Sequence, residues 1–218
     1  MARKSDARIA AIAVTGFAFI VTVIAFFTPY WLASERRFYG SEFDKLGLWE
    51  TCFRSIHSKD DLEMRKFYSG CRWIFAEEYR NLNDLLFPAF FVITQVFYTL
   101  GFIALLISVI ILLSVQLCAI LENQIKAFKY LALVMFFCAL FSTIAVVVFG
   151  IRGDDEGWMP EPEHNFLSWS FALAVVGTFF EWVAFILYWI ENRILVKKDL
   201  KRQHQMYGME PLAVKVCA

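Results

Sequence analysis

Four long apolar runs, separated by polar stretches, dominate the hydrophobic pattern of the chain. Because a helix needs about 20 apolar residues to cross a hydrocarbon core, each run predicts a transmembrane helix. The first run has no small-residue cleavage site and ends in Thr28-Pro29-Tyr30-Trp31, which is typical of an interfacial anchor, so we interpret it as a retained signal-anchor helix. The runs cover Ile9–Thr28, Pro88–Ser114, Phe128–Gly150 and Phe166–Ile190.

The polar stretch between the first two runs, residues 29–87, is the longest segment outside the predicted spans. Strand-like pieces occur around Arg37–Tyr39, Lys45–Cys52 and Lys66–Phe75, with turn residues between them. They predict a small antiparallel sheet that lies on the membrane face of the helix bundle. Glu77–Asp84 is predicted as a short helix that leads into the second span, whose first turn is fixed by Pro88.

The polar stretch between the last two runs, residues 151–165, is short and acidic. Pro160 and Pro162 predict a stiff turn, and Trp158 and Met159 precede them at its tip. We expect this pair to be exposed. Two alternatives are left open: the pair is a contact surface, or it dips into the lipid headgroups, where Trp is enriched.

The composition excludes a soluble domain, because the chain is 59% hydrophobic with a mean hydropathy of +0.55.

The distribution of charge along the chain predicts the orientation in the membrane, although the 21 basic and 21 acidic residues balance overall. Basic residues gather in the N-terminal tail (1–8), around the link between the second and third spans (115–127) and in the C-terminal tail (191–218). The positive-inside rule therefore places these segments in the cytoplasm and both other loops outside. The C-terminal tail is predicted to be flexible.

The five cysteines sort by predicted compartment. Cys52 and Cys71 lie in the first outside loop, where disulfides persist, and they form the one bridge that we expect. Cys138 lies within the third span, and Cys217 is second from the end, which excludes a prenylation box. Cys118, at the cytoplasmic end of the second span, is a candidate palmitoylation site, with an unmodified buried cysteine as the alternative.

Candidate chemistry is sparse. Glu181 is the one acidic residue well inside a predicted span, which makes it a functional candidate. The other spans offer mainly hydroxyl partners, so we interpret it as a packing residue, with Gly177 giving close helix approach; a transport role is the alternative. The histidines at 57, 164 and 204 are too scattered for one metal site. Catalytic and cofactor motifs are missing, so the sequence indicates no enzyme, no catalytic residue, no metal and no cofactor.

One motif in the first outside loop indicates which family of membrane proteins the chain resembles. The motif is Trp31, then Gly47-Leu48-Trp49, then Cys52 and Cys71, in a four-span chain. With this motif the chain resembles the claudin superfamily, which comprises claudins, peripheral myelin protein 22 relatives and calcium-channel gamma subunits. The resemblance covers residues 9–193. It implies an all-α membrane protein, a left-handed-type bundle of four transmembrane helices with a small extracellular antiparallel β-sheet. The wide cysteine spacing looks most like invertebrate claudins of insect septate junctions. The chain does not end in the PDZ ligand of many claudins.

The resemblance implies a cell–cell junction protein that forms or organises a paracellular barrier at lateral plasma-membrane contacts. Its implied partners are copies of itself or of related claudins on the same and the opposing cell, other junction proteins and the bilayer, and no nucleic acid. The first alternative function is an auxiliary subunit of a channel or receptor, and the second is a small transporter.

Within the motif, Leu48 and Trp49 are expected to wedge into the outer mouth of the bundle, where Gly47 permits the sharp approach. Trp49→Ala is therefore expected to harm folding more than Trp158→Ala.

Overall fold

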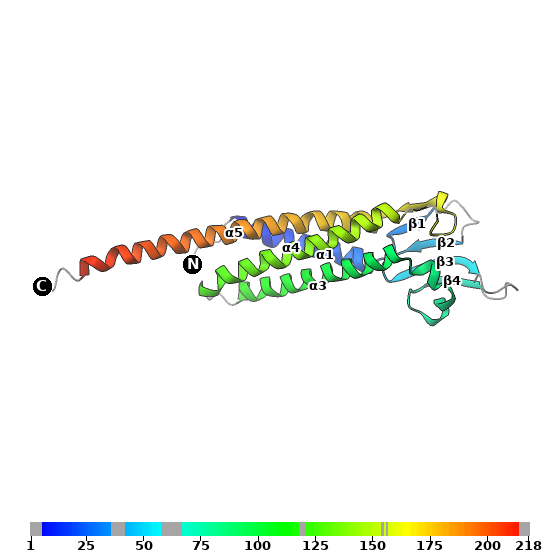
Figure 1. The fold of residues 1–218 in the computed structure, drawn as a ribbon, viewed down its shortest axis with the longest axis horizontal. Helices are drawn as coiled ribbons and strands as arrows, with labels where there is room; N and C mark the ends of the chain where they lie inside the picture. The colour runs from blue at the N-terminus through cyan, green and yellow to red at the C-terminus, as the bar shows by residue number, and fades with distance from the viewer. Residues whose placement is uncertain are drawn as a thin grey trace.

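Four helices form the body of the molecule. In the computed structural model they run side by side along the long axis, and each is long and apolar enough to cross a membrane (Figure 1). A long apolar helix therefore lies where each of the four spans was predicted. The helices are α1 (Asp6–Phe27), α3 (Ala89–Leu117), α4 (Leu121–Arg152) and α5 (Trp169–Ala213). The structure describes residues 6–35, 42–57, 67–117, 121–153, 155 and 157–213.

The helices pack as neighbours in the order α1, α5, α4 and α3. Small residues set two of these contacts. A Cβ on Gly177 would lie 2.8 Å from the Thr22 Oγ1 of α1, and a Cβ on Gly101 would lie 2.6 Å from the Ser142 Oγ of α4. Because a membrane gives little hydrophobic drive between helices, close backbone approach at small residues is a main source of helix association. The expected role of Gly177 is confirmed, and Gly101 has the same role between α3 and α4.

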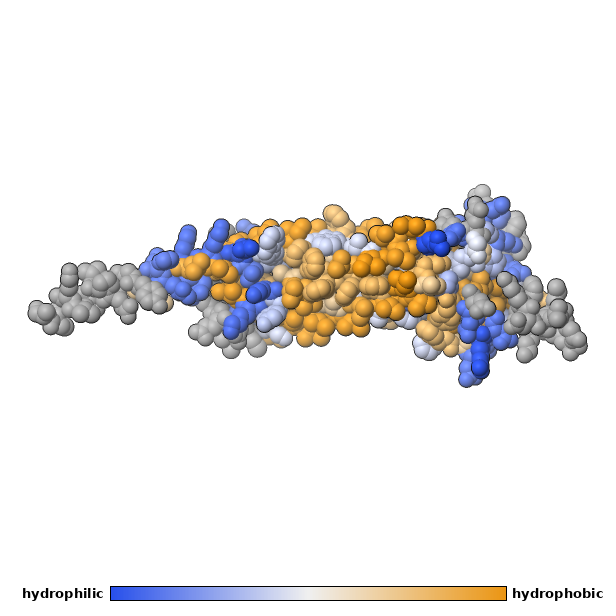
Figure 2. Space-filling view, in the orientation of Figure 1, coloured by the Kyte–Doolittle hydropathy of each residue, from blue (hydrophilic) through white to orange (hydrophobic). Residues whose placement is uncertain are grey.

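The face of the molecule seen in Figure 2 is apolar along the middle of its length and polar at both ends. Large side chains such as Ile110 and Phe179 point outward and are exposed on the isolated chain. A continuous apolar belt of this kind is expected where the hydrocarbon core of a bilayer surrounds the protein. The fold class predicted from the sequence is therefore confirmed.

Helix α5 is longer than predicted. It continues past the predicted fourth span to Ala213 and projects beyond the other helices (Figure 1). The sequence predicts a flexible tail over about the last 25 residues, which is wrong as far as Ala213, where α5 ends. Between Glu191 and Met206 the chain has no Pro or Gly and is rich in Leu, Lys, Arg and Gln, all of high helix propensity.

A β-sheet caps one end of the bundle (Figure 1). Five strands of the described residues form it in the order β4-β3-β2-β1-β5, and each neighbouring pair is antiparallel. Helix α1 begins and helix α5 ends at the opposite end of the molecule. The strands are β1 (Leu32–Ser34), β2 (Phe43–Leu46), β3 (Glu50–His57), β4 (Phe67–Trp73) and β5 (Asn165–Leu167).

The strands differ in part from those predicted. The single strand expected over Lys45–Cys52 is divided between β2 and β3, because Gly47-Leu48-Trp49 forms the turn of a hairpin. Strand β4 lies within the predicted Lys66–Phe75, and Arg37–Tyr39 falls outside the described residues. Phe166 and Leu167, predicted to begin the fourth span, instead pair with β1 as part of β5, so α5 starts only at Trp169.

Two short elements connect the sheet to α3. The 3₁₀ helix η1 (Glu77–Leu82) is followed by one turn of α-helix, α2 (Asn83–Leu86). The predicted helical approach over Glu77–Asp84 is confirmed. The backbone N–H groups of Phe91 and Val92 then donate to the carbonyl of Pro88, which starts α3 at the predicted proline.

Candidate functional site: the sheet and its attachment to the bundle

The turn of the β2–β3 hairpin lies directly against the end of α1. The Gly47 N–H donates to the Glu50 carbonyl at 2.8 Å and closes the turn. A Cβ on Gly47 would lie 2.6 Å from the Cα of Pro29 and 2.7 Å from the carbonyl oxygen of Thr28, and both neighbours are backbone atoms. Since backbone cannot move aside as a side-chain tip can, glycine is needed at this position for close approach.

Leu48 and Trp49 fix this turn to the mouth of the bundle. Leu48 is fully buried, and its carbonyl accepts a hydrogen bond of 2.6 Å from the Nε2 of Gln95 in α3. The partly exposed Trp49 ring lies 5.6 Å from the Phe26 ring at the end of α1. The turn therefore sits between α1 and α3, which agrees with the expected wedge at the outer mouth of the bundle.

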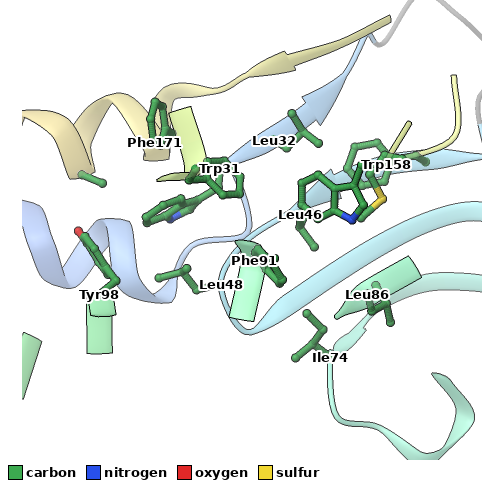
Figure 3. Packing of buried hydrophobic residues seen from close by; sticks show 14 of the residues in the cluster. Trp31, Leu32, Leu46, Leu48, Ile74, Leu86, Phe91, Tyr98, Trp158 and Phe171 are labelled. Atoms are coloured by element: carbon green, nitrogen blue, oxygen red, sulfur yellow. The ribbon is translucent and has the colours of Figure 1, made fainter. Parts of the chain in front are cut away.

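Trp31 lies at the centre of the junction between sheet and helices (Figure 3). It is fully buried, and its indole N–H donates to the Ala25 carbonyl at 2.8 Å. Its ring meets those of Tyr98 and Phe149 edge to face, each at 5.0 Å. The interpretation of Trp31 as part of an interfacial anchor is wrong, because β1 pairs on both sides and holds the residue beneath the sheet.

Cys52 and Cys71 are joined in a disulfide across β3 and β4, so the predicted bridge is confirmed. The two residues are directly opposite each other in the strand register, with their Cα atoms 4.0 Å apart. The carboxylate of Glu50 lies within 4.8 Å of both sulfur atoms. Because metal binding by cysteine requires the thiolate, this group of three is not a metal site while the bridge is intact.

We predict that Cys52→Ser lowers surface delivery strongly. The bridge closes a loop of about 20 residues, which corresponds to about 3 kcal/mol in the chain-entropy account, and β4 has one strand neighbour among the described residues. Surface biotinylation measures the effect, with Cys217→Ser in the C-terminal tail as the control. Mass mapping without reduction that finds both Cys52 and Cys71 as free thiols would contradict the prediction.

Trp158 and Met159 are not a surface pair. They are 8% and 4% exposed, so the expectation of an exposed contact pair is wrong. The Trp158 indole N–H donates to the Leu85 carbonyl at 2.8 Å, and its ring lies 4.8 Å from that of Phe90 and 5.4 Å from that of Phe91. The pair ties the second loop to the segment that enters α3.

The second loop is also part of the sheet. Leu32, Ala33 and Ser34 of β1 pair with Leu167, Phe166 and Asn165 of β5. Backbone hydrogen bonds continue the contact, since Ser168 N–H donates to the Trp31 carbonyl at 3.0 Å. Both loops therefore form one platform. Sequence reasoning missed β1 and β5, because a strand of three residues carries no alternating pattern.

The β4 edge of the sheet exposes large aromatic side chains that sequence reasoning did not single out. Phe67, at one end of the strand, is 60% exposed, and Trp73, at the other end, is 61% exposed. Trp73 is paired with Glu50, next to the turn that contacts the bundle. This position fits the membrane interface, where Trp is enriched, whereas Phe67 lies six residues along the strand from it.

Charged side chains on the sheet are partly paired with one another. Arg54 contacts Asp44 at 3.3 Å, and Arg72 contacts Glu78 at 2.7 Å. Burial raises the pKa of the Tyr79 phenol above its usual value, although the nearby Arg72 acts in the opposite direction. Tyr79 is thus a neutral packing residue near physiological pH.

A family model described as PMP-22/EMP/MP20/Claudin tight junction matches residues 16–190. The chain belongs to this family. Among curated proteins, none matches the chain significantly. The six motif residues of the claudin resemblance all fall within the matched span: Trp31, Gly47, Leu48, Trp49, Cys52 and Cys71. The structure places the first four where the sheet is attached to the bundle and the two cysteines in the sheet, between β3 and β4.

Glu181 lies at the centre of the bundle of this claudin-family chain. It is fully buried, and the Thr22 hydroxyl of α1 donates to its Oε1 at 3.3 Å. Cys138 and Ser142 of α4 flank the carboxyl group. Gly177, one turn earlier on α5, is the residue that brings α1 close. The site therefore joins three helices through one side chain, which supports the packing interpretation.

We predict that Glu181→Gln leaves surface delivery and cell-contact localisation unchanged. The amide keeps an oxygen that accepts from Thr22 and a nearly equal volume, so the unfolding free energy should change by about 1 kcal/mol or less. Glu181→Ala is the contrasting variant, because it removes the acceptor and leaves a cavity. Normal trafficking with lost function in Glu181→Gln would instead support a transport role.

Two further ionisable side chains are buried at the end of the bundle away from the sheet, and their burial was not predicted from the sequence. Arg8 of α1 and Glu191 of α5 are both in the buried class. Arg8 donates to the Gln124 Oε1 of α4 at 3.5 Å and lies over the Phe128 ring at 5.1 Å. Arg8 therefore belongs to the helix interface, and not to a free N-terminal tail.

The other predicted residues divide as follows. His164 lies in the short helix η2 (Pro162–His164) beside the sheet, whereas His204 lies in the projecting part of α5, so these two do not meet. Cys138 is buried in α4, as its place in the third span predicted. Cys118 and Cys217 fall outside the described residues, and palmitoylation of Cys118 stays a prediction.

Proposed function

We propose that this claudin-family chain is a cell–cell junction protein that forms or organises a paracellular barrier at lateral plasma-membrane contacts. One observation carries the proposal: strands from both loops form a single sheet, which a disulfide holds together and which the motif residues attach to the bundle. Such a platform keeps a fixed shape outside the bilayer. A fixed shape is what repeated contacts between copies require, because disordered loops lose entropy at every contact.

The proposed orientation places the sheet outside the cell and the opposite end in the cytoplasm. It is supported by the basic residues near the helix ends away from the sheet, including Lys126, Lys129, Arg193 and Lys197. It also fits a disulfide in the sheet, because disulfides persist in the oxidising extracellular space. Both termini are then cytoplasmic.

We assign contacts with neighbouring copies to the β4 edge. An edge strand presents unpaired backbone groups to another chain, and Phe67 adds an exposed aromatic side chain at one end of this strand. The proposed partners are copies of this chain or related claudins on the same and the opposing cell, and other junction membrane proteins. Septate junctions of invertebrates are the proposed setting.

The test is the position and barrier effect of the tagged chain in a polarised epithelium. We expect a continuous lateral belt at cell contacts and a raised transepithelial resistance. Phe67→Ser should lower the resistance at normal surface levels, whereas Phe166→Ser, an exposed aromatic on the other edge strand β5, is the matched control. Diffuse surface staining that follows a co-expressed channel would contradict the proposal and favour an auxiliary-subunit role.

A further inference from the structure

A groove of about 590 Å³ lies between α4 and α5 toward the end of the bundle away from the sheet. Its walls are mainly apolar and aromatic, and they belong to the surface that the bilayer would cover. Two basic residues also line it, one from each helix, and no acidic residue is among its lining residues. The residues that matter here are Lys129, Leu133 and Phe136 of α4, and Phe185, Trp189 and Arg193 of α5.

The two walls change from basic to apolar in the same direction. On α4, Lys129 is followed toward the sheet by Leu133 and Phe136, while on the antiparallel α5, Arg193 is followed toward the sheet by Trp189 and Phe185. A groove with charge at one mouth and apolar walls beyond it has the polarity of a phospholipid that stands in one leaflet of a membrane.

Aromatic contacts shape the apolar part of the groove. The Phe185 ring lies 5.5 Å from that of Phe136 across the two helices and 6.4 Å from that of Trp189, with which it stacks nearly in parallel. The Arg193 guanidinium lies over the Trp189 ring, 5.6 Å from its centroid. This cation–π contact holds the positive charge of Arg193 at the mouth of the groove.

We propose that this groove binds one anionic glycerophospholipid. The charged headgroup contacts Lys129 and Arg193, and an acyl chain lies against Leu133, Phe136 and Phe185. Basic pockets between transmembrane helices at the cytoplasmic side are a known physical basis for anionic headgroup binding. A second groove, of about 370 Å³, shares Trp189 and Arg193 and extends to Lys197, which adds a third basic residue beside the headgroup.

The charge pattern argues against a second copy of the chain as the occupant. In a two-fold symmetric contact the same surface meets itself, so Lys129 and Arg193 of one copy would face the like charges of the other. The apolar walls also belong to two helices apolar enough to span a membrane, and a lipid reaches them without leaving the bilayer.

Native mass spectrometry of the full-length chain tests the proposal. The purified protein is titrated with an equimolar mixture of phosphatidylserine and phosphatidylcholine that carry the same acyl chains. We expect wild type to retain phosphatidylserine preferentially, and K129Q/R193Q to lower this preference about tenfold. The matched control is K198Q/R202Q, which removes the same charge from exposed positions of α5 that do not line the groove.

A second variant tests the groove itself. Leu133 is 52% exposed, so Leu133→Trp fills the groove without changing its charge. We expect it to lower retention of phosphatidylserine several-fold while the unfolding temperature stays the same. If Leu133→Trp retained as much phosphatidylserine as wild type, the headgroup would be bound without the groove. That result would overturn the proposal.

Two other results would also overturn it: an equal loss of preference in K129Q/R193Q and K198Q/R202Q, or no preference for phosphatidylserine in wild type. The measurement uses no cells and does not depend on which side of the membrane is cytoplasmic. Failure of the junction proposal therefore leaves this result intact, and failure here does not affect the junction proposal.

Discussion

Trp31→Ala is expected to prevent most of the chain from reaching the cell surface. The indole is fully buried, and it contacts the rings of Tyr98 and Phe149 at 5.0 Å. Removing a buried Trp side chain costs about 3–5 kcal/mol, which is a large share of the 5–15 kcal/mol that stabilises a typical domain. The contacts are lost where β1, α3, α4 and α5 meet. The variant should therefore weaken both the packing of the helices and the attachment of the sheet to them.

The measurement is thermal unfolding of the purified protein in detergent, together with surface biotinylation in cells. Trp73→Ala is the matched control, because the same atoms are removed from a side chain that is 61% exposed. We expect the control to unfold within a few degrees of wild type. Equal unfolding temperatures for Trp31→Ala and wild type would show that the aromatic cluster does not hold the sheet on the bundle.

The sequence was a good guide to features that depend on composition and compartment. Helix spans follow from apolar length, and the Cys52–Cys71 bridge follows from two cysteines in one outside loop. Gly47 was correctly linked to a close approach, because glycine lets two segments of backbone come close together. These inferences need only local sequence and one physical rule each.

The sequence was a poor guide to the burial of the loop tryptophans. Trp31 and Trp158 both follow or enter membrane spans, where an interfacial position is the usual expectation. Their burial depends on contacts distant in the chain: the Trp158 N–H bonds to the carbonyl of Leu85, 73 residues away. No local pattern encodes such a partner. Trp73, which the sequence did not distinguish, is 61% exposed and so fits a position at the interface.

The sheet shows the same limit. Its β1–β5 pairing joins Leu32 to Leu167, two residues that belong to different loops. Each strand has three residues, too short for an alternating pattern. The pairing follows from the bundle, because α1 and α5 are packed together and bring the chain that leaves one helix beside the chain that enters the other. Tertiary packing therefore determines these strands.

The structure leads us to expect the opposite order of effects for two tryptophan variants. The sequence predicts that Trp49→Ala is more harmful than Trp158→Ala, because Trp49 belongs to the motif. In the structure Trp49 is partly exposed, and its indole N–H has no partner among the described residues. Trp158 is 8% exposed, its N–H is hydrogen-bonded to Leu85, and its ring packs against those of Phe90 and Phe91.

We therefore expect Trp158→Ala to lower the unfolding free energy by about 3–5 kcal/mol, and Trp49→Ala to lower it by less. The physical reason is the deeper burial of Trp158, because its truncation leaves a cavity between the second loop and α3 and removes the hydrogen bond to the Leu85 carbonyl. Thermal unfolding in one detergent, with surface biotinylation beside it, compares the two variants. A larger loss in Trp49→Ala would show that attachment of the β2–β3 turn, and not of the second loop, limits the stability of the platform.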